Sequence, residues 1–377
     1  MMIRATLFSV IFAASQCAAA LVTNSIWYAS SVSEDGNGPL DLLALIAYDD
    51  TRTNAPIGVV MHGFFGVTVT GLVTNNLRRL VDQGLFAVAP ALRGRDGSDG
   101  TRDSGGLEVQ DIVDAVRAVR AAYPALVDAE RTYLSGYSGG GGNAMSCLVR
   151  FPDFFTLAAS FFGMSDYGYD QTYGWYFNGA AADHIAIMTQ DVGVATGATG
   201  DVQDAYRARA SYLGRANVVT PAHLFYDSNE SVCPPSHQTR FANGNTNITL
   251  HEGAPGTWPH GYLTDAQQAA AETNILPALV DGSIENPSIP TSGALYVQGW
   301  VECIDPPLRC TAGNGVSGSG VLSYVLQSGG GWFRWTAADN ASSSAVLTFG
   351  GRMWTLASGD QAQHTPDMRS SVVVIVR

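Results

Sequence analysis

The sequence predicts an α/β fold with a mostly parallel sheet, followed by a small all-β domain. Between residues 40 and 280, short apolar segments alternate with segments of helical periodicity. Strands that are apolar on both faces belong to parallel sheets covered by helices on each side. After a linker-like stretch at 287–292, the chain changes to short β-prone runs separated by Gly, Ser and Asn, which is typical of a small antiparallel domain.

The expected strands of the α/β region are short and end in polar or Gly-rich loops. They comprise residues 40–48, 57–61, 85–90, 132–137, 157–162, 222–226 and 247–250. Helical spacing of apolar residues predicts helices at 75–83, at 109–123, directly after residue 138, and at 264–278. Because open α/β sheets bind ligands at the carboxyl ends of their strands, the residues after each strand are the first candidates for a functional site.

Residues 163–220 interrupt this alternation. Aromatic residues gather between Tyr167 and Phe177, and helices are expected at 185–193 and 201–213. An insertion after the strand at 157–162 would overhang the site. It is expected to form either a wall or lid over the substrate or a small core of its own.

The β-rich C-terminal region has expected strands at 294–298, 321–326, 345–349 and 372–376. Its tryptophans are dense for so short a segment, namely Trp300, Trp332, Trp335 and Trp354. They are expected to form the core of the domain. The alternative is an exposed platform that contacts a polymeric substrate.

Composition and charge limit the function. A chain of 377 residues with 46% hydrophobic residues suits about two folded domains. The formal net charge is −13, and every basic residue is an arginine, without basic runs. The sequence therefore argues against nucleic acid and anionic membrane surfaces as partners.

The N-terminus has the pattern of a signal peptide. Arg4 precedes an apolar run at 7–14, and small residues follow at 18–20. Cleavage after Ala20 predicts an exported protein, secreted or periplasmic, and no later segment is apolar enough for a membrane anchor. The expected units are residues 1–20 as signal peptide, 21–286 as the α/β domain and 287–377 as an accessory β domain.

Cysteines in an exported protein can be oxidised. Cys303 and Cys310 flank a short Pro-containing loop, and we expect a disulfide between them. Cys147 and Cys233 either pair with each other or remain two buried thiols. No Cys or His cluster indicates a metal site, and the acidic residues between 96 and 103 do not have the spacing of a calcium loop.

The strongest motif is Gly136-Tyr137-Ser138-Gly139-Gly140, between an expected strand and an expected helix. This G-x-S-x-G arrangement is the nucleophile elbow of α/β-hydrolases, whose sharp turn raises the serine above the sheet. The glycines are required because a Cβ there would collide with neighbouring strands. The alternative is a flexible Gly/Ser turn in a Gly-rich chain.

A serine nucleophile needs a base and an acid, which follow it in this order in α/β-hydrolases: Ser, acid, His. Glu230 and Asp227 both follow the strand at 222–226 and are the candidate acids. His260 lies in a loop of turn-forming residues before the last helix and is the candidate base. His251 lies at the end of the strand, too early in the chain for the base, and His223 and His237 are expected to be structural or surface residues.

Several motifs, taken in order, resemble the catalytic domain of the prolyl oligopeptidase family (serine peptidase family S9) and its dienelactone-hydrolase-like relatives. The resemblance covers roughly residues 55–280. It rests on segments 59–63 (Val-Val-Met-His-Gly), 90–94 (Pro-Ala-Leu-Arg-Gly), 109–115, 127–131, 135–140, 151–155 and 165–167. The family usually has Asp-x-x-Val-Pro at the acid. Here Glu230-Ser-Val-Cys-Pro234 places a glutamate in that position, and Asp227 is the alternative acid.

The resemblance and the elbow geometry both imply an oxyanion hole formed by the backbone N–H groups of Phe64 and Gly139. Phe65, Tyr137 and Trp175 are then expected to line an apolar substrate pocket. Arg93 and Arg95 are expected to anchor their loop through ion pairs. No cofactor is expected.

The expected function is a serine hydrolase that cleaves carboxylic esters through an acyl-enzyme. The catalytic residues would be Ser138, His260 and Glu230. The first alternative is an S9-type peptidase acting on short peptides; family peptidases usually carry an N-terminal propeller, and little precedes the α/β domain here. The second alternative is a noncatalytic secreted binding protein with the same fold.

Overall fold

The computed structural model describes residues 21–34, 38–65, 73–258, 260, 265–328, 330–338 and 343–364. The expected signal peptide and the expected strand at 372–376 lie outside these residues.

The α/β domain is built on one mostly parallel sheet, which confirms the predicted fold class. Its strand order is β1-β2-β4-β3-β5-β6-β7-β8. The pairs β1–β2 and β2–β4 are antiparallel, and β4, β3, β5, β6, β7 and β8 run parallel. The strands are β1 (Leu21–Ala29), β2 (Asp41–Asp49), β3 (Ala55–Met61), β4 (Phe86–Pro90), β5 (Val127–Tyr137), β6 (Leu157–Phe161), β7 (Ala222–Asp227) and β8 (Ile248–Gly253).

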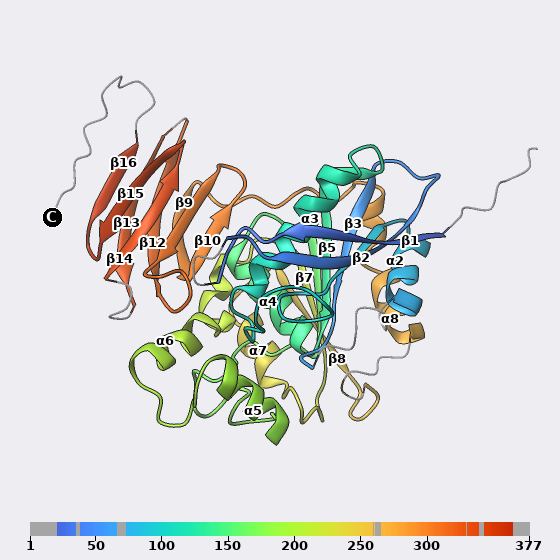
Figure 1. The fold of residues 1–377 in the computed structure, drawn as a ribbon, viewed down its shortest axis with the longest axis horizontal. Coiled ribbons are helices and arrows are strands. Elements are labelled where there is room, and N and C mark those ends of the chain that lie inside the picture. Colours follow the sequence, from blue (N-terminus) through green and yellow to red (C-terminus); the bar gives the residue numbers. More distant parts are fainter. Residues whose placement is uncertain are drawn as a thin grey trace, which may run out of the picture.

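Helices cover both faces of this sheet (Figure 1). They are a π-helical turn (Val73–Leu77), α2 (Arg78–Asp82), α3 (Glu108–Ala122), α4 (Gly139–Arg150), α7 (Ser236–Ala242), α8 (Asp265–Thr273) and α9 (Pro277–Val280). Successive residues of one strand point to opposite faces. Val59 of β3 packs into the cluster formed with α3 and α4, whereas Val60 packs with α2 and α9. Both faces of the strand are apolar because both are buried.

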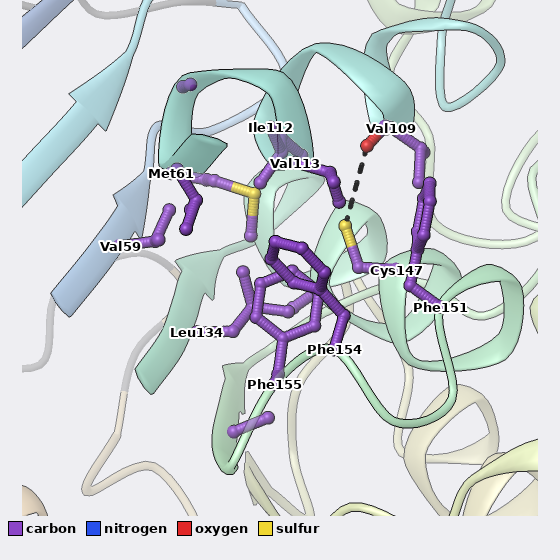
Figure 2. Packing of buried hydrophobic residues seen from close by; sticks show 14 of the residues in the cluster. Val59, Met61, Val109, Ile112, Val113, Leu134, Cys147, Phe151, Phe154 and Phe155 are labelled. Carbon is purple, nitrogen blue, oxygen red and sulfur yellow. Dashed lines mark hydrogen bonds between the residues drawn. The ribbon is translucent and has the colours of Figure 1, made fainter. Parts of the chain in front are cut away.

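The cluster beneath α3 and α4 contains Cys147 (Figure 2). Its thiol points at the carbonyl oxygen of Val109, 3.8 Å away, among the aromatic rings of Phe151, Phe154 and Phe155. Burial raises the pKa of this thiol well above its ordinary value, so it remains protonated and unreactive.

The inserted segment forms a small core of its own. It contains α5 (Ala182–Asp191), α6 (Gly200–Ala208) and a 3₁₀ helix (Ser211–Asn217). Tyr167, Trp175 and Tyr206 are almost completely buried, together with Met188. Most of the aromatic cluster therefore stabilises the segment itself.

The C-terminal domain is an eight-stranded antiparallel sheet with the order β15-β14-β11-β10-β9-β12-β13-β16. Its strands are β9 (Ser292–Gln298), β10 (Trp300–Cys303), β11 (Leu308–Ala312), β12 (Ser319–Gln327), β13 (Gly330–Ala337), β14 (Ser344–Phe349), β15 (Arg352–Ala357) and β16 (Gln361–His364). Trp300, Trp335 and Trp354 are buried, and Trp332 is half-buried. Trp335 and Trp354 therefore belong to the core of this domain, whereas Trp300 packs into the cluster beneath α3 and α4.

The predicted disulfide between Cys303 and Cys310 is wrong. Cys147, Cys233, Cys303 and Cys310 are all free thiols. On the antiparallel strands β10 and β11, Cys303 lies opposite Leu308 and Cys310 lies opposite Val301. The two cysteines are therefore diagonal neighbours, about 7–8 Å apart, which exceeds the usual span of a disulfide.

Arg150, the last residue of α4, joins the two domains and the insertion. Its guanidinium donates to the carbonyl oxygens of Gln298 in β9, Ala208 in α6, and Gly105 and Gly106 in the loop before α3. It also lies 4.4 Å from the ring centroid of Trp300. Burial lowers the pKa of Arg150 to about 10, and carbonyl dipoles replace water around its charge.

A column of stacked rings crosses the parallel strands. Tyr137, Phe161, Phe225 and His251 lie on β5, β6, β7 and β8, with successive ring centroids 4.9, 4.7 and 4.4 Å apart. At its end, His251 Nε2 lies 2.9 Å from His223 Nδ1. Burial and the neighbouring His251 lower the pKa of His223 to about 4, and burial lowers the pKa of His251.

Among the residues that the structure describes, no helix is both long enough and apolar enough to cross a membrane.

We expect Arg150→Met to destabilise both domains. The substitution removes the hydrogen bonds to buried carbonyl groups, which should lower the free energy of unfolding by about 3–5 kcal/mol. Urea denaturation measures this loss. Arg78→Met is the control. The side chains of Arg78 and Asp82 are each 66% exposed, so their ion pair should contribute less than about 1 kcal/mol to the free energy of unfolding. Equal effects of the two substitutions would contradict the role of Arg150.

The paired histidines predict a loss of stability in mild acid. His223 binds a proton more weakly in the folded than in the unfolded state. Stability therefore falls as pH drops from about 6.5 towards about 4. His223→Gln should reduce the loss between pH 7 and pH 5 by about 1 kcal/mol, allowing for the partial exposure of the ring. Urea unfolding at both pH values tests this, and an unchanged pH dependence would refute it.

Candidate active site

Ser138 occupies the sharp turn between β5 and α4. Its φ and ψ are 51° and −116°, a strained conformation for a residue other than glycine. A Cβ at Gly136 would lie 2.3 Å from the carbonyl oxygen of Gly140, and a Cβ at Gly140 would lie 2.5 Å from that of His62. Only glycine fits these positions, as the sequence predicted.

His260 links the nucleophile to a carboxylate. Its Nε2 lies 3.0 Å from Ser138 Oγ, and its Nδ1 lies 3.1 Å from Glu230 Oε2. When Nδ1 carries the proton and donates to Glu230, Nε2 is free to accept the proton of the serine hydroxyl. The structure thus brings the three residues together in the order nucleophile, base, acid.

The Glu230 carboxylate is held by its own loop. Oε1 accepts hydrogen bonds from the backbone N–H groups of Val232 and Cys233 at 2.6 and 3.3 Å. Burial alone would raise the pKa of Glu230, but the bonds from His260 and from these two N–H groups outweigh it, so the pKa is lowered. The carboxylate is ionised at neutral pH and can stabilise an imidazolium on His260.

Asp227, the alternative acid, points elsewhere. Its carboxylate accepts hydrogen bonds from the backbone N–H groups of Asn229, Gly256 and Trp258, at 2.8, 3.0 and 2.9 Å. The last two belong to the loop that carries His260. Asp227 therefore anchors the histidine loop, whereas Glu230 contacts the histidine itself.

The two expected oxyanion donors lie side by side. A Cβ at Gly139 would be 2.6 Å from the backbone nitrogen of Phe64, so glycine is required for the two amides to approach. Arg95 holds the Phe64 segment: it donates to the Phe64 carbonyl oxygen at 3.4 Å and to the buried Glu108 at 3.2 Å. The sequence predicted an ion pair for Arg95, but it did not identify Glu108 or Phe64 as partners, because they are brought together only by folding.

Of the expected pocket residues, only Phe65 presents a large surface, at 55% exposure. The Tyr137 ring is half-buried in the stacked column, and Trp175 has no exposed surface. The structure therefore places these two behind the site. The sequence did not single out His184, whose ring centroid lies 4.2 Å from that of Phe65. It belongs to α5, which begins earlier than the apolar pattern suggested.

His237 is a structural residue, as expected. His237 is buried, and its Nδ1 accepts a hydrogen bond from the backbone N–H of Ser165. Burial lowers the pKa of His237 to about 3, so its ring is neutral. Within the described residues, no three His, Cys, Asp or Glu side chains gather as a metal site would require.

Comparison with known proteins confirms the resemblance drawn from the sequence. Residues 73–244 match the model of the prolyl oligopeptidase family. The matched segment includes Ser138 and Glu230 and ends before His260. No curated protein matches the chain by sequence.

Solved structures share the fold. A puromycin hydrolase aligns with a TM-score of 0.55 and 19% identity over 72% of this chain and 40% of its own. A Mycobacterium tuberculosis puromycin-hydrolyzing peptidase has a TM-score of 0.52 and 18% identity over 68% and 40% of the two chains. Pyrococcus horikoshii acylaminoacyl peptidase has a TM-score of 0.52 and 17% identity over 69% and 42%. The aligned part is thus about two fifths of each of these proteins, and the α/β-hydrolase fold is confirmed.

The two acidic residues should respond differently to substitution. Glu230→Gln removes the charge that stabilises the imidazolium. It should slow labelling of Ser138 by a fluorophosphonate probe on the order of 10²–10⁴-fold. Asp227→Asn keeps an acceptor oxygen for the loop, so it should slow labelling by about 10-fold or less. Labelling rates at neutral pH measure both, and the reverse order would contradict the assignment of Glu230.

Proposed function

We propose that this chain, whose fold and central sequence resemble the prolyl oligopeptidase family, is a serine hydrolase that cleaves carboxylic esters. The observation that carries the proposal is the continuous hydrogen-bonded chain from Ser138 Oγ through His260 to Glu230. A nucleophile on a strained turn, a base within hydrogen-bonding distance and an acid that orients the base are the elements of acyl transfer.

The proposed reaction has two steps. Ser138 Oγ attacks the ester carbonyl carbon while His260 Nε2 takes the hydroxyl proton. The N–H groups of Phe64 and Gly139 stabilise the oxyanion, and His260 returns the proton to the departing alcohol. In the second step His260 Nε2 takes a proton from water as the water oxygen attacks the acyl-enzyme carbonyl carbon. His260 then returns this proton to Ser138 Oγ as the acyl–Oγ bond breaks and the carboxylic acid leaves.

The preference for esters is proposed from the surroundings of the site. Phe65 presents an exposed aromatic ring next to the oxyanion residue Phe64, and the His184 ring packs against it at a tilt of 32°. Arg95 and Glu108, the charged residues held behind Phe64, are bonded to each other, so they offer no free charge to a peptide terminus. An apolar acyl or alkyl group suits such a surface better than a charged peptide end does.

Peptide-bond cleavage is the second candidate. It is favoured by the family match and by the names of the similar structures, which include an acylaminoacyl peptidase and a puromycin-hydrolyzing peptidase. Both reactions use the same acyl-enzyme chemistry, so the substrate is what separates them.

A substrate panel tests the proposal. We expect hydrolysis of p-nitrophenyl acetate and butyrate, with at least about 10²-fold lower activity on Xaa-Pro and other peptide anilides. Ser138→Ala should remove both the hydrolysis and the fluorophosphonate labelling. The opposite substrate preference would favour a peptidase. A wild-type protein that neither hydrolyses the esters nor becomes labelled would favour a noncatalytic binding protein.

A further inference from the structure

Trp175 contacts two parts of the active site, the loop that carries Glu230 and the oxyanion residue Phe64, but is itself fully buried. The residue belongs to the inserted segment and has no exposed surface. Its indole Nε1–H donates to the carbonyl oxygen of Val232 at 2.6 Å. Its ring packs edge-on against Phe64, with centroids 5.0 Å apart. One side chain thus touches the loop of the acid and the residue of the oxyanion hole.

The hydrogen bond from Trp175 to Val232 holds the residue that in turn binds the Glu230 carboxylate. The N–H of Val232 donates to Glu230 Oε1 while its carbonyl accepts from Trp175. Fixing this one peptide segment therefore fixes the direction of the Glu230 carboxylate. The other oxygen of that carboxylate, Oε2, accepts a hydrogen bond from His260 Nδ1.

A second contact from the insertion clamps the same loop. Gly179 has φ of +112°, and a Cβ there would lie 2.3 Å from the carbonyl oxygen of Val232 and 2.9 Å from Pro234. The backbone of the insertion therefore lies directly against the loop of the acid. No side chain other than hydrogen fits between them.

Trp175 is itself rigidly held. Its backbone N–H donates to the carbonyl oxygen of Asp166, and the Asp166 carboxylate accepts the N–H groups of Gly168, Tyr169 and Asp170. Its ring packs in the core of the insertion with Tyr167 and Met188. A rigid donor is what a positioning role requires, because misplacement of a catalytic group by about 1 Å lowers the rate strongly.

We propose that Trp175 is a positioning residue that orients Glu230 through Val232, so that the inserted segment completes the catalytic triad. This inference rests on the proposed function, because it assigns a role within that reaction. It replaces the expectation that Trp175 lines the substrate pocket.

The test is a double-mutant cycle with Trp175→Phe and Glu230→Gln, measured as kcat and KM on p-nitrophenyl butyrate. Phenylalanine keeps an aromatic ring but lacks the N–H. We expect Trp175→Phe alone to lower kcat by about 10-fold, with KM changed less than about 2-fold. In the Glu230→Gln background it should lower kcat by less than about 2-fold, because the group that it positions is already inactive.

Two controls separate positioning from loss of structure. Tyr176→Phe removes a hydrogen bond to Thr189 within the same segment and should leave kcat within about 2-fold. Gly179→Ala should lower kcat like Trp175→Phe. Gly197→Ala, which also replaces a glycine of positive φ but meets no atom within 4 Å, should not. Circular dichroism verifies that each variant is folded, and the glycine pair tests the proposal even if Trp175→Phe does not fold.

The outcomes are distinct. If Trp175→Phe raises KM and preserves kcat, the residue contacts substrate and the positioning role is refuted. The positioning role is also refuted if Trp175→Phe lowers kcat equally in the wild-type and Glu230→Gln backgrounds, or if Gly179→Ala and Gly197→Ala lower kcat equally. In either case the activity of the wild type leaves the proposed function intact. If the wild type shows neither hydrolysis nor labelling, the proposed function fails and the positioning role fails with it.

Discussion

The close approach of three backbone segments at the elbow is the constraint on which the rest of the site depends. Gly139 and Gly140 let the turn of Ser138 pass against the end of β3 and the loop that follows it, and Gly136 lets β5 pass against the start of α4. The same contact that forces glycine at 139 places its amide beside that of Phe64. The strained conformation of the serine and the paired oxyanion donors therefore have one cause, which is backbone packing without side chains.

Asp227 and Glu230, the two carboxylates that follow β7, have different roles in the site. Asp227, at the end of β7, binds backbone N–H groups of the histidine loop, and Glu230, further along the chain, binds the histidine. The longer side chain of glutamate can reach the ring from a loop that turns back on itself. Because backbone amides satisfy the remaining oxygen of Glu230, its charge remains buried at a tolerable free-energy cost.

The domains are not independent modules. Trp300 of the C-terminal domain belongs to the same hydrophobic cluster as Phe151 and Phe154 of the α/β domain. Arg150 extends from the end of the helix that begins at the nucleophile to the first strand of the β domain. The elbow helix is therefore supported at its far end by the insertion and the accessory domain together.

The sequence by itself determined the elements that local patterns encode. Apolar runs with helical segments between them predicted the parallel sheet, and the spacing of Gly136, Ser138 and Gly140 predicted the nucleophile. Chain order narrowed the base to His260 and the acid to Glu230 or Asp227. Only the tertiary structure decided between these carboxylates, because both follow the same strand and their partners lie some thirty residues further on. It likewise decided the burial of Trp175 and the register that keeps Cys303 and Cys310 apart, since contacts between distant segments leave no periodic pattern in the sequence.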